Sequence, residues 1–200
     1  MLFRSEHAEL GKIKIEELKL LTLPNGVEIK FEEIVALAGD FYGLPNQPII
    51  DPDLNDVDKE DSGRHQCFRD SYNTLARTPK SDLQSELDKL LATLKKEIET
   101  GTAAAASTWD EITGGVWVAG VPVKQGRMMQ LAETNYDHFL PNAKNAYLTG
   151  HQLAIDKARE AGNYSEDDKD EEKRLLHEAF SMEAFSCHFL TDSFASGHIR

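Results

Sequence analysis

The sequence predicts a mainly helical fold, a multi-helix bundle, with a small β-hairpin near its N-terminus. Two patterns indicate this fold: apolar residues recur at spacings of three and four over several long stretches, and one alternating stretch flanks a turn signal, Pro24-Asn25-Gly26. The chain has 200 residues, enough for one domain with a hydrophobic core, and nothing suggests a division. We therefore expect a single domain over residues 1–200.

The first elements follow directly from these patterns. Residues 11–31 alternate apolar and polar side chains on both sides of the turn, which is typical of a hairpin. Residues 31–37 change to helical spacing, and this helix meets the bend Gly39-Asp40-Phe41-Tyr42-Gly43, where two glycines flank a carboxylate. A polar loop is expected over residues 44–63. Its acidic run DPDLNDVDKED resembles a calcium loop but lacks the required glycine and closing glutamate, so we interpret it as solvated.

Helices dominate the remaining prediction. Two are expected over residues 65–77 and 81–100, the second amphipathic with Ser81 as its N-cap. Residues 101–127 combine an alanine run with GGVWVAGVPVKQG, which indicates an extended excursion or a short hairpin. Helical spacing then resumes near Met128 and continues past Pro141 to Glu160. After the charged loop NYSEDDKDEEK, a final helix is expected over 172–196, ended by Gly197.

The charge balance narrows the possible functions. The formal net charge of −13 argues against a protein that holds nucleic acid mainly through a basic surface. A substrate that carries phosphate would need another source of positive charge, which bound divalent cations can supply. The longest apolar stretches are far shorter than the roughly 20 residues of a membrane-spanning helix. The N-terminus also lacks the apolar core of a signal peptide, so we expect none in this sequence.

The cysteines do not indicate a thiolate metal site. Cys67 and Cys187 lie far apart and form no CxxC pair. They are compatible either with one disulfide or with two free thiols, so cysteine usage leaves the compartment open.

The final predicted helix carries the strongest metal-binding pattern. His188 and Asp192 are four residues apart and therefore share a helix face, where together they can hold one ion. His198 follows Asp192 by six residues, just past the glycine expected to end the helix. A carboxylate between two histidines can bridge two ions. His177 lies three helical turns before His188 and is interpreted as a partly buried histidine, with a supporting role beside the site as the alternative.

A second segment supplies further candidates. Asp137 precedes His151 by fourteen residues, with Pro141 between them to break or kink the chain. His138 competes with Asp137 for a ligand role, because spacing alone does not resolve a shift of one residue. His65 has no partner at helical spacing and is interpreted as structural or exposed.

These motifs carry a resemblance to a known superfamily. Asp-x13-His followed by His-x3-Asp-x5-His is similar to the ligand order of the zinc-dependent phospholipase C and fungal single-strand nuclease superfamily, an all-helical fold with three zinc ions. The stretches IVALAGDFYG and HFLTDSFASGH resemble more closely the Pseudomonas fluorescens-type phospholipase C branch. The resemblance implies a first zinc, a bridging role for Asp192 and a further zinc site begun by His198. The implied ligands of the first zinc are Asp137, His151, His188 and Asp192.

The sequence departs from those relatives at both ends. The relatives use an N-terminal tryptophan amine and a nearby histidine for one zinc, whereas this chain begins with Met1. We hypothesise that His7 and Asp40 hold that zinc; the alternative is a turn-capping Asp40 and a surface His7. A His-x3-Glu or His-x3-Asp pair completes the last site in the relatives, and the chain stops at Arg200, so we expect a C-terminally truncated piece.

The expected activity is the hydrolysis of a glycerophospholipid by two or three zinc ions, giving diacylglycerol and a phosphorylated headgroup. Asp137 is the expected proton acceptor. The resemblance implies a secreted enzyme that contacts membrane surfaces transiently. A single-strand nuclease and a non-catalytic helical module are the alternatives. The aromatic residues Trp109, Trp117, Phe41 and Tyr42 are expected either to line a pocket for a headgroup or base, or to pack in the core.

Overall fold

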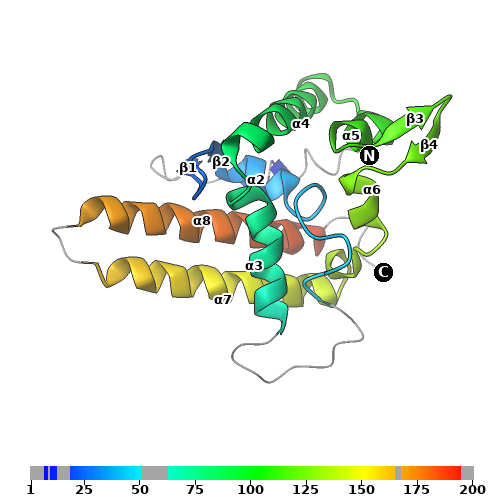
Figure 1. The fold of residues 1–200 in the computed structure, drawn as a ribbon. Coiled ribbons are helices and arrows are strands. Elements are labelled where there is room, and N and C mark those ends of the chain that lie inside the picture. Colours follow the sequence, from blue (N-terminus) through cyan, green and yellow to red (C-terminus); the bar gives the residue numbers. More distant parts are fainter. Residues whose placement is uncertain (1–6, 9, 13–18, 51–62, 165–167, 195–200) are drawn as a thin grey trace.

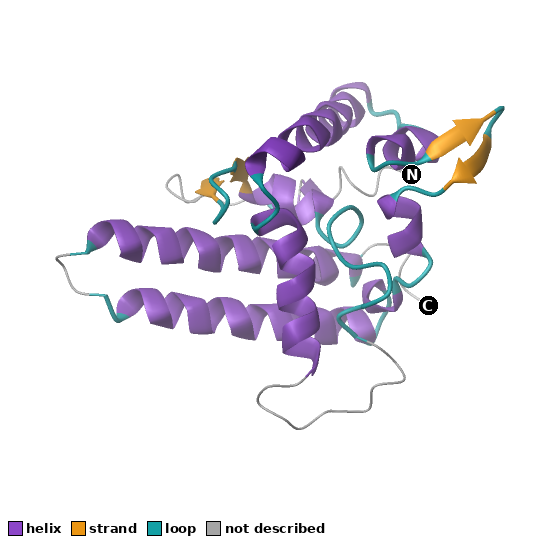
Figure 2. Ribbon diagram, in the orientation of Figure 1, coloured by secondary structure: helices purple, strands orange, loops and turns teal. Residues whose placement is uncertain are grey.

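The computed structural model describes residues 7–8, 10–12, 19–50, 63–164 and 168–194. Over these residues the fold is mainly helical, with two separate pairs of antiparallel strands (Figures 1 and 2). In chain order the elements are β1 (Leu20–Thr22), β2 (Glu28–Lys30), α2 (Phe31–Leu37), α3 (Gly63–Ala76), α4 (Lys80–Thr100), α5 (Ala106–Ile112), β3 (Val116–Val118), β4 (Val121–Lys124), α6 (Arg127–Ala132), the 3-10 helix η2 (Tyr136–His138), α7 (Asn142–Gly162) and α8 (Lys169–Asp192).

The long helices α7 and α8 form an antiparallel pair that α3 crosses (Figure 1). The crossing is close because Gly150 of α7 has no side chain. A Cβ atom at Gly150 would lie 2.2 Å from Cε2 of Phe68 in α3 and 2.6 Å from Cβ of Ser186 in α8. The three helices therefore meet at a glycine, and the rings of Phe68 and Phe185 pack edge to face beside it, 5.6 Å apart.

The N-terminal hairpin predicted over residues 11–31 is confirmed over residues 20–30, whereas Gly11 lies in a turn and residues 13–18 fall outside the described residues. Leu21 and Ile29 face each other across β1 and β2, and both are buried. In the turn, the Asn25 side-chain amide donates to the carbonyls of Leu75 and Thr78 at the end of α3. The hairpin is thereby fixed to the helical core. The predicted bounds of α2 are also confirmed, and five of its seven residues are buried.

The amphipathic helix α4 is confirmed, but the prediction of its N-cap is wrong. Leu83, Leu87, Leu90 and Leu94 are buried at the expected spacing. Pro79 occupies the N-cap position, and Ser81 lies inside the first turn, where its hydroxyl donates to Asp82. The helix can begin without a side-chain cap because the carboxylate of Asp82 in its first turn favours the positive end of the helix dipole.

Two predictions between residues 101 and 160 need correction. The alanine run is not part of an extended segment, because it leads into α5. The alternative prediction for this region, a short hairpin, is confirmed by β3 and β4. The continuous helix from Met128 to Glu160 is wrong, because α6 ends at Ala132 and α7 begins only at Asn142. Pro141 explains the break: proline lacks the N–H that a helix interior requires, and it disfavours helical geometry in the preceding residue.

The last helix is displaced toward the N-terminus relative to its prediction. It begins at Lys169, inside the stretch predicted as a charged loop, because the Asp168 carboxylate accepts a hydrogen bond from the Glu171 amide as its N-cap. It ends at Asp192 instead of residue 196. The predicted stop at Gly197 lies outside the described residues.

Two further observations concern compartment and membrane. Cys67 and Cys187 are both free thiols, so the disulfide alternative is wrong. None of the helices over the described residues combines the length and hydropathy that crossing a bilayer requires.

Replacing the glycine at the helix crossing tests this packing. We expect Gly150→Ala to lower the free energy of unfolding by about 1–3 kcal/mol, because the added methyl overlaps Phe68 and Ser186. Gly162→Ala is the matched control: it lies at the other end of α7, and its Cβ would meet nothing within 4 Å. Urea denaturation measures both variants. Equal stability of the two would contradict the close crossing.

Candidate metal centre

Five side chains from separate parts of the chain converge at one end of the helix pair. His188 and Asp192 come from the last turns of α8, and His138 comes from η2. Asp40 lies in the bend after α2, and His7 in a helical segment near the N-terminus. Asp40 is half-buried, whereas the other four are at most 3% exposed. The centre is therefore a buried cluster with one edge nearer to solvent.

Three of these side chains stand at the separations expected of ligands around a single ion. The Nε2 atom of His188 is 3.3 Å from Nδ1 of His138 and 3.5 Å from Oδ2 of Asp192, and the last two atoms are 2.9 Å apart. Tetrahedral zinc with bonds of 2.0–2.1 Å separates its ligand atoms by about 3.3 Å. Asp40 forms a candidate ligand group with His138 and His188, their donor atoms within 4.8 Å of one another. Asp40, His138 and His188 can thus surround one cation.

Asp192 also faces a second imidazole through its other oxygen. Its Oδ1 atom is 3.4 Å from Nε2 of His7, and His7, His188 and Asp192 form the second candidate ligand group among the described residues. Asp192 therefore presents one oxygen to His138 and His188 and the other to His7. This arrangement would allow Asp192 to bridge two cations, the role that the resemblance implies for it.

A carbonyl at the end of α2 determines which ring nitrogen of His188 carries a hydrogen. Its Nδ1 atom is 2.9 Å from the carbonyl oxygen of Val35, and a carbonyl only accepts hydrogen bonds, so Nδ1 carries the proton. Val35 lies in the last turn of α2, where carbonyls have no partner within the helix. In the neutral imidazole the lone pair of His188 is then on Nε2, the atom that faces Asp192. Fixing the tautomer of a ligand histidine in this way is usual around protein-bound metals.

Thr191 orients His7 by a similar chain of hydrogen bonds. The Thr191 hydroxyl donates to the carbonyl of His188 at 2.7 Å, so its oxygen accepts from Nδ1 of His7 at 2.5 Å. The lone pair of His7 is then on Nε2, toward Asp192. Burial, followed by the nearby His188, lowers the pKa of His7 to about 4. His7 is therefore neutral at neutral pH, the form that binds metal ions.

The carboxylates of the cluster favour positive charge. Burial alone would lower the pKa of His138, but the charge and hydrogen bond of Asp192 and the charges of Asp137 and Asp40 outweigh it and raise that pKa to about 9. Burial raises the pKa of Asp137, whose Oδ2 atom accepts a hydrogen bond from the Ile49 amide. A site that stabilises a proton on a buried imidazole in this way also suits a cation.

The structure does not bring all of the predicted first-zinc ligands together. Asp137 lies outside both candidate groups, with Oδ1 3.7 Å from Nε2 of its neighbour His138. His151 also lies outside them: its Nδ1 atom is 2.8 Å from Glu183, and its ring stacks on Tyr147. In the described geometry Asp40 and His138 stand beside His188 instead. The competition between Asp137 and His138 was visible in the sequence, whereas the grouping of Asp40 with them was not.

The remaining candidates are placed as follows. His198 and the acidic run 51–61 both lie outside the described residues, so the predictions for them are not tested. His177 accepts a hydrogen bond from the Thr22 amide, far along α8 from the cluster, which agrees with a partly buried structural histidine. His65 is half-buried on α3.

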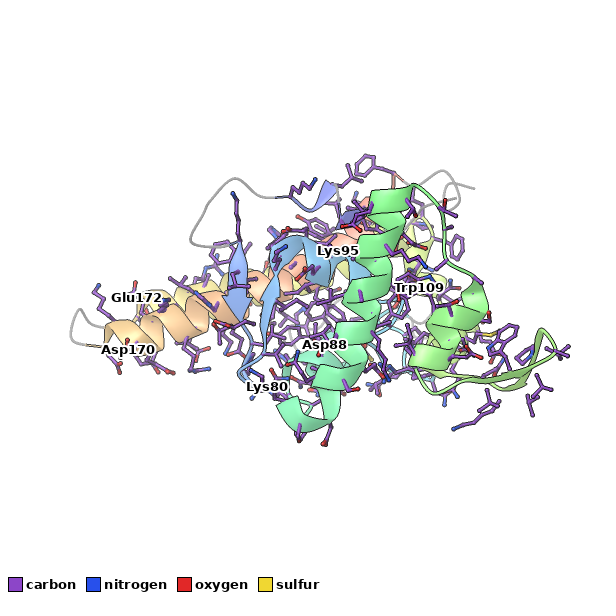
Figure 3. All side chains as sticks on the ribbon, turned by 90° about the horizontal axis from the view of Figure 1, so that it is seen from above. Lys80, Asp88, Lys95, Trp109, Asp170 and Glu172 are labelled. Carbon is purple, nitrogen blue, oxygen red and sulfur yellow. The ribbon has the colours of Figure 1, made fainter. Side chains whose placement is uncertain are left out.

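Most of the candidate aromatic residues belong to the core. Trp109 belongs to α5 (labelled in Figure 3), and its ring lies 5.1 Å from that of Phe41. Trp109, Phe41 and Tyr42 are at most 1% exposed, so the core interpretation is confirmed for them. Trp117, by contrast, is half-buried in β3.

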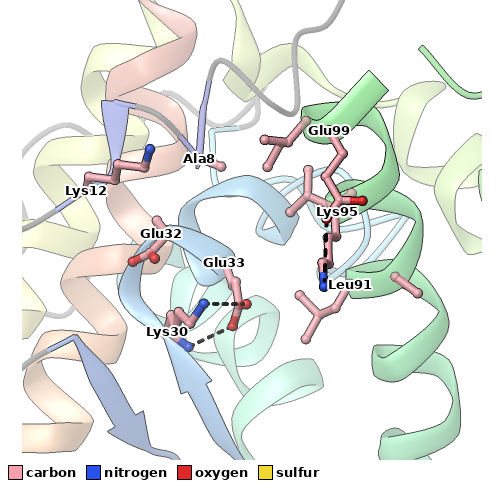
Figure 4. A pocket seen from close by; sticks show the side chains of 11 residues that line it. Ala8, Lys12, Lys30, Glu32, Glu33, Leu91, Lys95 and Glu99 are labelled. Atoms are coloured by element: carbon pink, nitrogen blue, oxygen red, sulfur yellow. Dashed lines mark hydrogen bonds and ion pairs between the residues drawn. The ribbon is translucent and has the colours of Figure 1, made fainter. Parts of the chain in front are cut away.

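Two pockets lie near the candidate metal centre and the helices beside it. A small cavity of about 20 Å³ adjoins the cluster, lined in part by Gly39, Asp137 and His138; it has room for about one water molecule. A larger pocket of about 470 Å³ lies between α2 and α4 (Figure 4). Its walls are apolar side chains of α4 and the ion pairs Lys30–Glu33 and Lys95–Glu99, with no histidine among them.

No family model, curated protein or solved structure matches the chain. The class of the site therefore rests on its own geometry: a buried cluster of imidazoles and carboxylates that suits one or two divalent cations.

The glycine beside the cluster provides a test of this geometry. Gly39 has φ +70°, and a Cβ there would lie 2.7 Å from Cδ2 of His188 and 2.8 Å from Cε1 of His138. We expect Gly39→Ala to reduce zinc affinity at least tenfold in a chelator competition, because the methyl displaces both rings. Gly26→Ala is the control: at φ +77° it carries similar backbone strain, but its Cβ meets nothing within 4 Å. Equal zinc affinity of the two variants would contradict the proposed cluster.

The hydroxyl that orients His7 provides a second test. We expect Thr191→Val to weaken zinc binding by roughly 10–100-fold with little change in volume, because His7 loses the acceptor that fixes its tautomer. Thr149→Val removes a comparable hydroxyl, bonded only to the Asn145 carbonyl within α7, and should leave affinity unchanged. Isothermal titration with zinc compares the two. If Thr191→Val binds zinc like the unmodified protein, His7 does not belong to the centre.

Proposed function

We propose that this protein is a zinc-dependent phosphodiester hydrolase that cleaves glycerophospholipids to diacylglycerol and a phosphorylated headgroup. One observation carries the proposal: ligand atoms of His138, His188 and Asp192 lie at zinc-like separations, and the second oxygen of Asp192 faces His7. Imidazole nitrogen and carboxylate oxygen are the donors of catalytic zinc sites.

The residues of the centre fit a divalent cation in three ways. Hydrogen bonds fix His7 and His188 with their lone pairs toward Asp192. The half-buried Asp40 leaves one edge of the cluster closer to solvent, as a catalytic site requires for its open position. The neighbouring carboxylates raise the pKa of His138 by more than burial lowers it, so the cluster favours added positive charge.

Bound zinc would supply a Lewis acid for the phosphate oxygens and would lower the pKa of a coordinated water to about 7. The chain's own residues supply the remaining functions. Asp137 lines the small cavity beside His138, and burial raises its pKa, which makes its carboxylate a stronger proton acceptor. Gly39 leaves room for the two imidazole rings that its Cβ would otherwise displace.

Two features favour a lipid over a nucleic acid as the substrate. The sequence stretches around Asp40 and Asp192 resemble the phospholipase branch of the superfamily. The net charge of −13 disfavours prolonged contact with a polyanion, whereas a lipid headgroup carries its phosphate singly. The positive charge needed at the scissile phosphate would come from the centre itself.

Metal analysis and activity measured on the same variants test the proposal. We expect the protein to retain one or two zinc ions and to hydrolyse phosphatidylcholine. His188→Ala and Asp192→Asn should each lose zinc and at least a hundredfold in activity, because each removes a ligand at the centre of the cluster. His65→Ala, which removes a half-buried histidine of α3, should change neither.

The possible results separate the competing functions. Hydrolysis of single-stranded RNA without hydrolysis of phosphatidylcholine would replace the lipase by a nuclease and leave the metal centre intact. Protein that binds no zinc, even when zinc is added, would support a non-catalytic helical module. Full activity of both ligand variants would refute the centre as the site of reaction.

A further inference from the structure

The β3–β4 hairpin presents an apolar face to solvent. Val116 and Val118 alternate on β3, and Val118 pairs directly with Val121 of β4, so these three side chains share a face; Val123 lies at the register shift beside them. Their exposed fractions are 47%, 59%, 61% and 68% in chain order. The hairpin projects beyond the helices at one end of the molecule (Figure 1). We call these four residues the valine face.

The other face of the hairpin is fixed to the body of the protein by a buried carboxylate. Asp110 of α5 is fully buried, and it accepts hydrogen bonds from the Trp117 indole at 2.9 Å and from the Gly126 amide at 2.9 Å. The amide of Gly115 donates to the Asp110 carbonyl at 2.8 Å. Both ends of the hairpin are thus held on one residue. The valine face is therefore exposed on a braced element and not on a free loop.

The charge around the hairpin differs from that of the whole chain. The sequence has 35 acidic residues, yet none lies between residues 112 and 132, where the charged residues are Lys124 and Arg127. Lys124 is exposed at the base of the valine face. Acidic residues gather at the far end of α8, where Asp170 and Glu172 lie opposite the hairpin (Figure 3). The hairpin is thus the part of this acidic protein best suited to approach an anionic or zwitterionic surface.

The hairpin is also joined to the bend that carries Asp40. Arg127 follows the hairpin at the start of α6, and its Nε atom donates to the carbonyl of Phe41 at 2.6 Å. The guanidinium of Arg127 also forms an ion pair with Glu86 of α4 and lies over the ring of Tyr42. The base of the hairpin is therefore linked through Arg127 to the bend that carries Asp40.

We propose that the valine face docks this protein on a phospholipid bilayer, with the valines in the interfacial layer and Lys124 at the headgroups. This inference rests on the proposed lipid substrate and names the surface by which the protein reaches it. A second copy of the chain is a poorer occupant, because two molecules of net charge −13 repel each other, whereas no carboxylate of the 112–132 segment opposes a lipid surface. Burial of exposed apolar side chains drives the binding, and the exposed Lys124 supports it.

Vesicle sedimentation tests the proposal. The variant replaces all four valines by threonine, which keeps the β-branched shape and the net charge. The probe is sucrose-loaded vesicles of phosphatidylcholine, the zwitterionic lipid of the proposed reaction, with zinc withheld by a chelator so that no lipid is cleaved. We expect at least a tenfold loss of vesicle binding. The control replaces Leu20 and Tyr164 by threonine. Both side chains are exposed, by 48% and 39%, and both lie outside the β3–β4 hairpin. The control should bind like the unmodified protein.

A second measurement separates this inference from the proposed activity. Hydrolysis of a short-chain phosphatidylcholine below its micelle concentration requires no bilayer, so the four-threonine variant should cleave it at the unmodified rate while losing activity on vesicles. If no phosphodiester is hydrolysed but vesicle binding still depends on the valines, the docking surface stands and the enzymatic proposal fails. Equal vesicle binding by the variant and the unmodified protein would overturn the docking surface. Valine-dependent dimers that do not bind vesicles would overturn it as well.

Discussion

The structure depends on how it accommodates the carboxylate of Asp192, which is fully buried at the end of α8. A buried charge is costly unless positive or hydrogen-bonding partners surround it. Here His138 and His188 approach one oxygen and His7 approaches the other. These contacts hold η2 and the segment that carries His7 close to α8, and the hydrogen bond between His188 and the Val35 carbonyl holds the end of α2 there. The candidate chemistry and the arrangement of the elements around α8 thus have a common electrostatic origin.

The supporting contacts show how the backbone sets side-chain chemistry. The carbonyl of Val35 has no helical partner because α2 ends two residues later, and it therefore fixes the proton of His188. Gly39 then turns the chain at φ +70° against the same imidazole. The short helix α2 and the glycine after it consequently help to shape the centre, although the side chains of Val35 and Gly39 have no atom that could bind an ion.

Sequence patterns predicted the features that are local in the chain. The pairing of His188 with Asp192 follows from the four-residue period of a helix, and the bounds of α2 follow from its apolar spacing and the glycine after it. The sequence predicted that Pro141 would break or kink the chain, and spacing alone left the choice between Asp137 and His138 open. In the structure η2 is a separate 3-10 turn, and it places His138 against Asp192. Such a contact spans distant segments, which no spacing rule describes.

The same limit explains the grouping of the remaining residues. His7 and Asp40 were assigned together to one ion because His7 is the only early histidine and Asp40 lies in a bend flanked by glycines. In the structure Asp40 groups with His138 and His188, whereas His7 groups with His188 and Asp192. The alanine run before α5 was misread for another reason: the glycines and valines that follow it dominate the local composition, and the burial of Trp109 that stabilises this short helix depends on tertiary packing.

The hydrogen bond between His7 and Thr191 joins positions 184 residues apart. Bringing two such distant positions together costs the unfolded chain conformational entropy, which opposes folding. A permanent cross-link between them would remove this cost, which is on the order of 5 kcal/mol in the chain-entropy relation for disulfides. A cation shared by His7 and Asp192 would act as such a cross-link, reversible and controlled by the free metal concentration. Metal supply would then govern resistance to unfolding, and depletion of the cation would release His7 from α8.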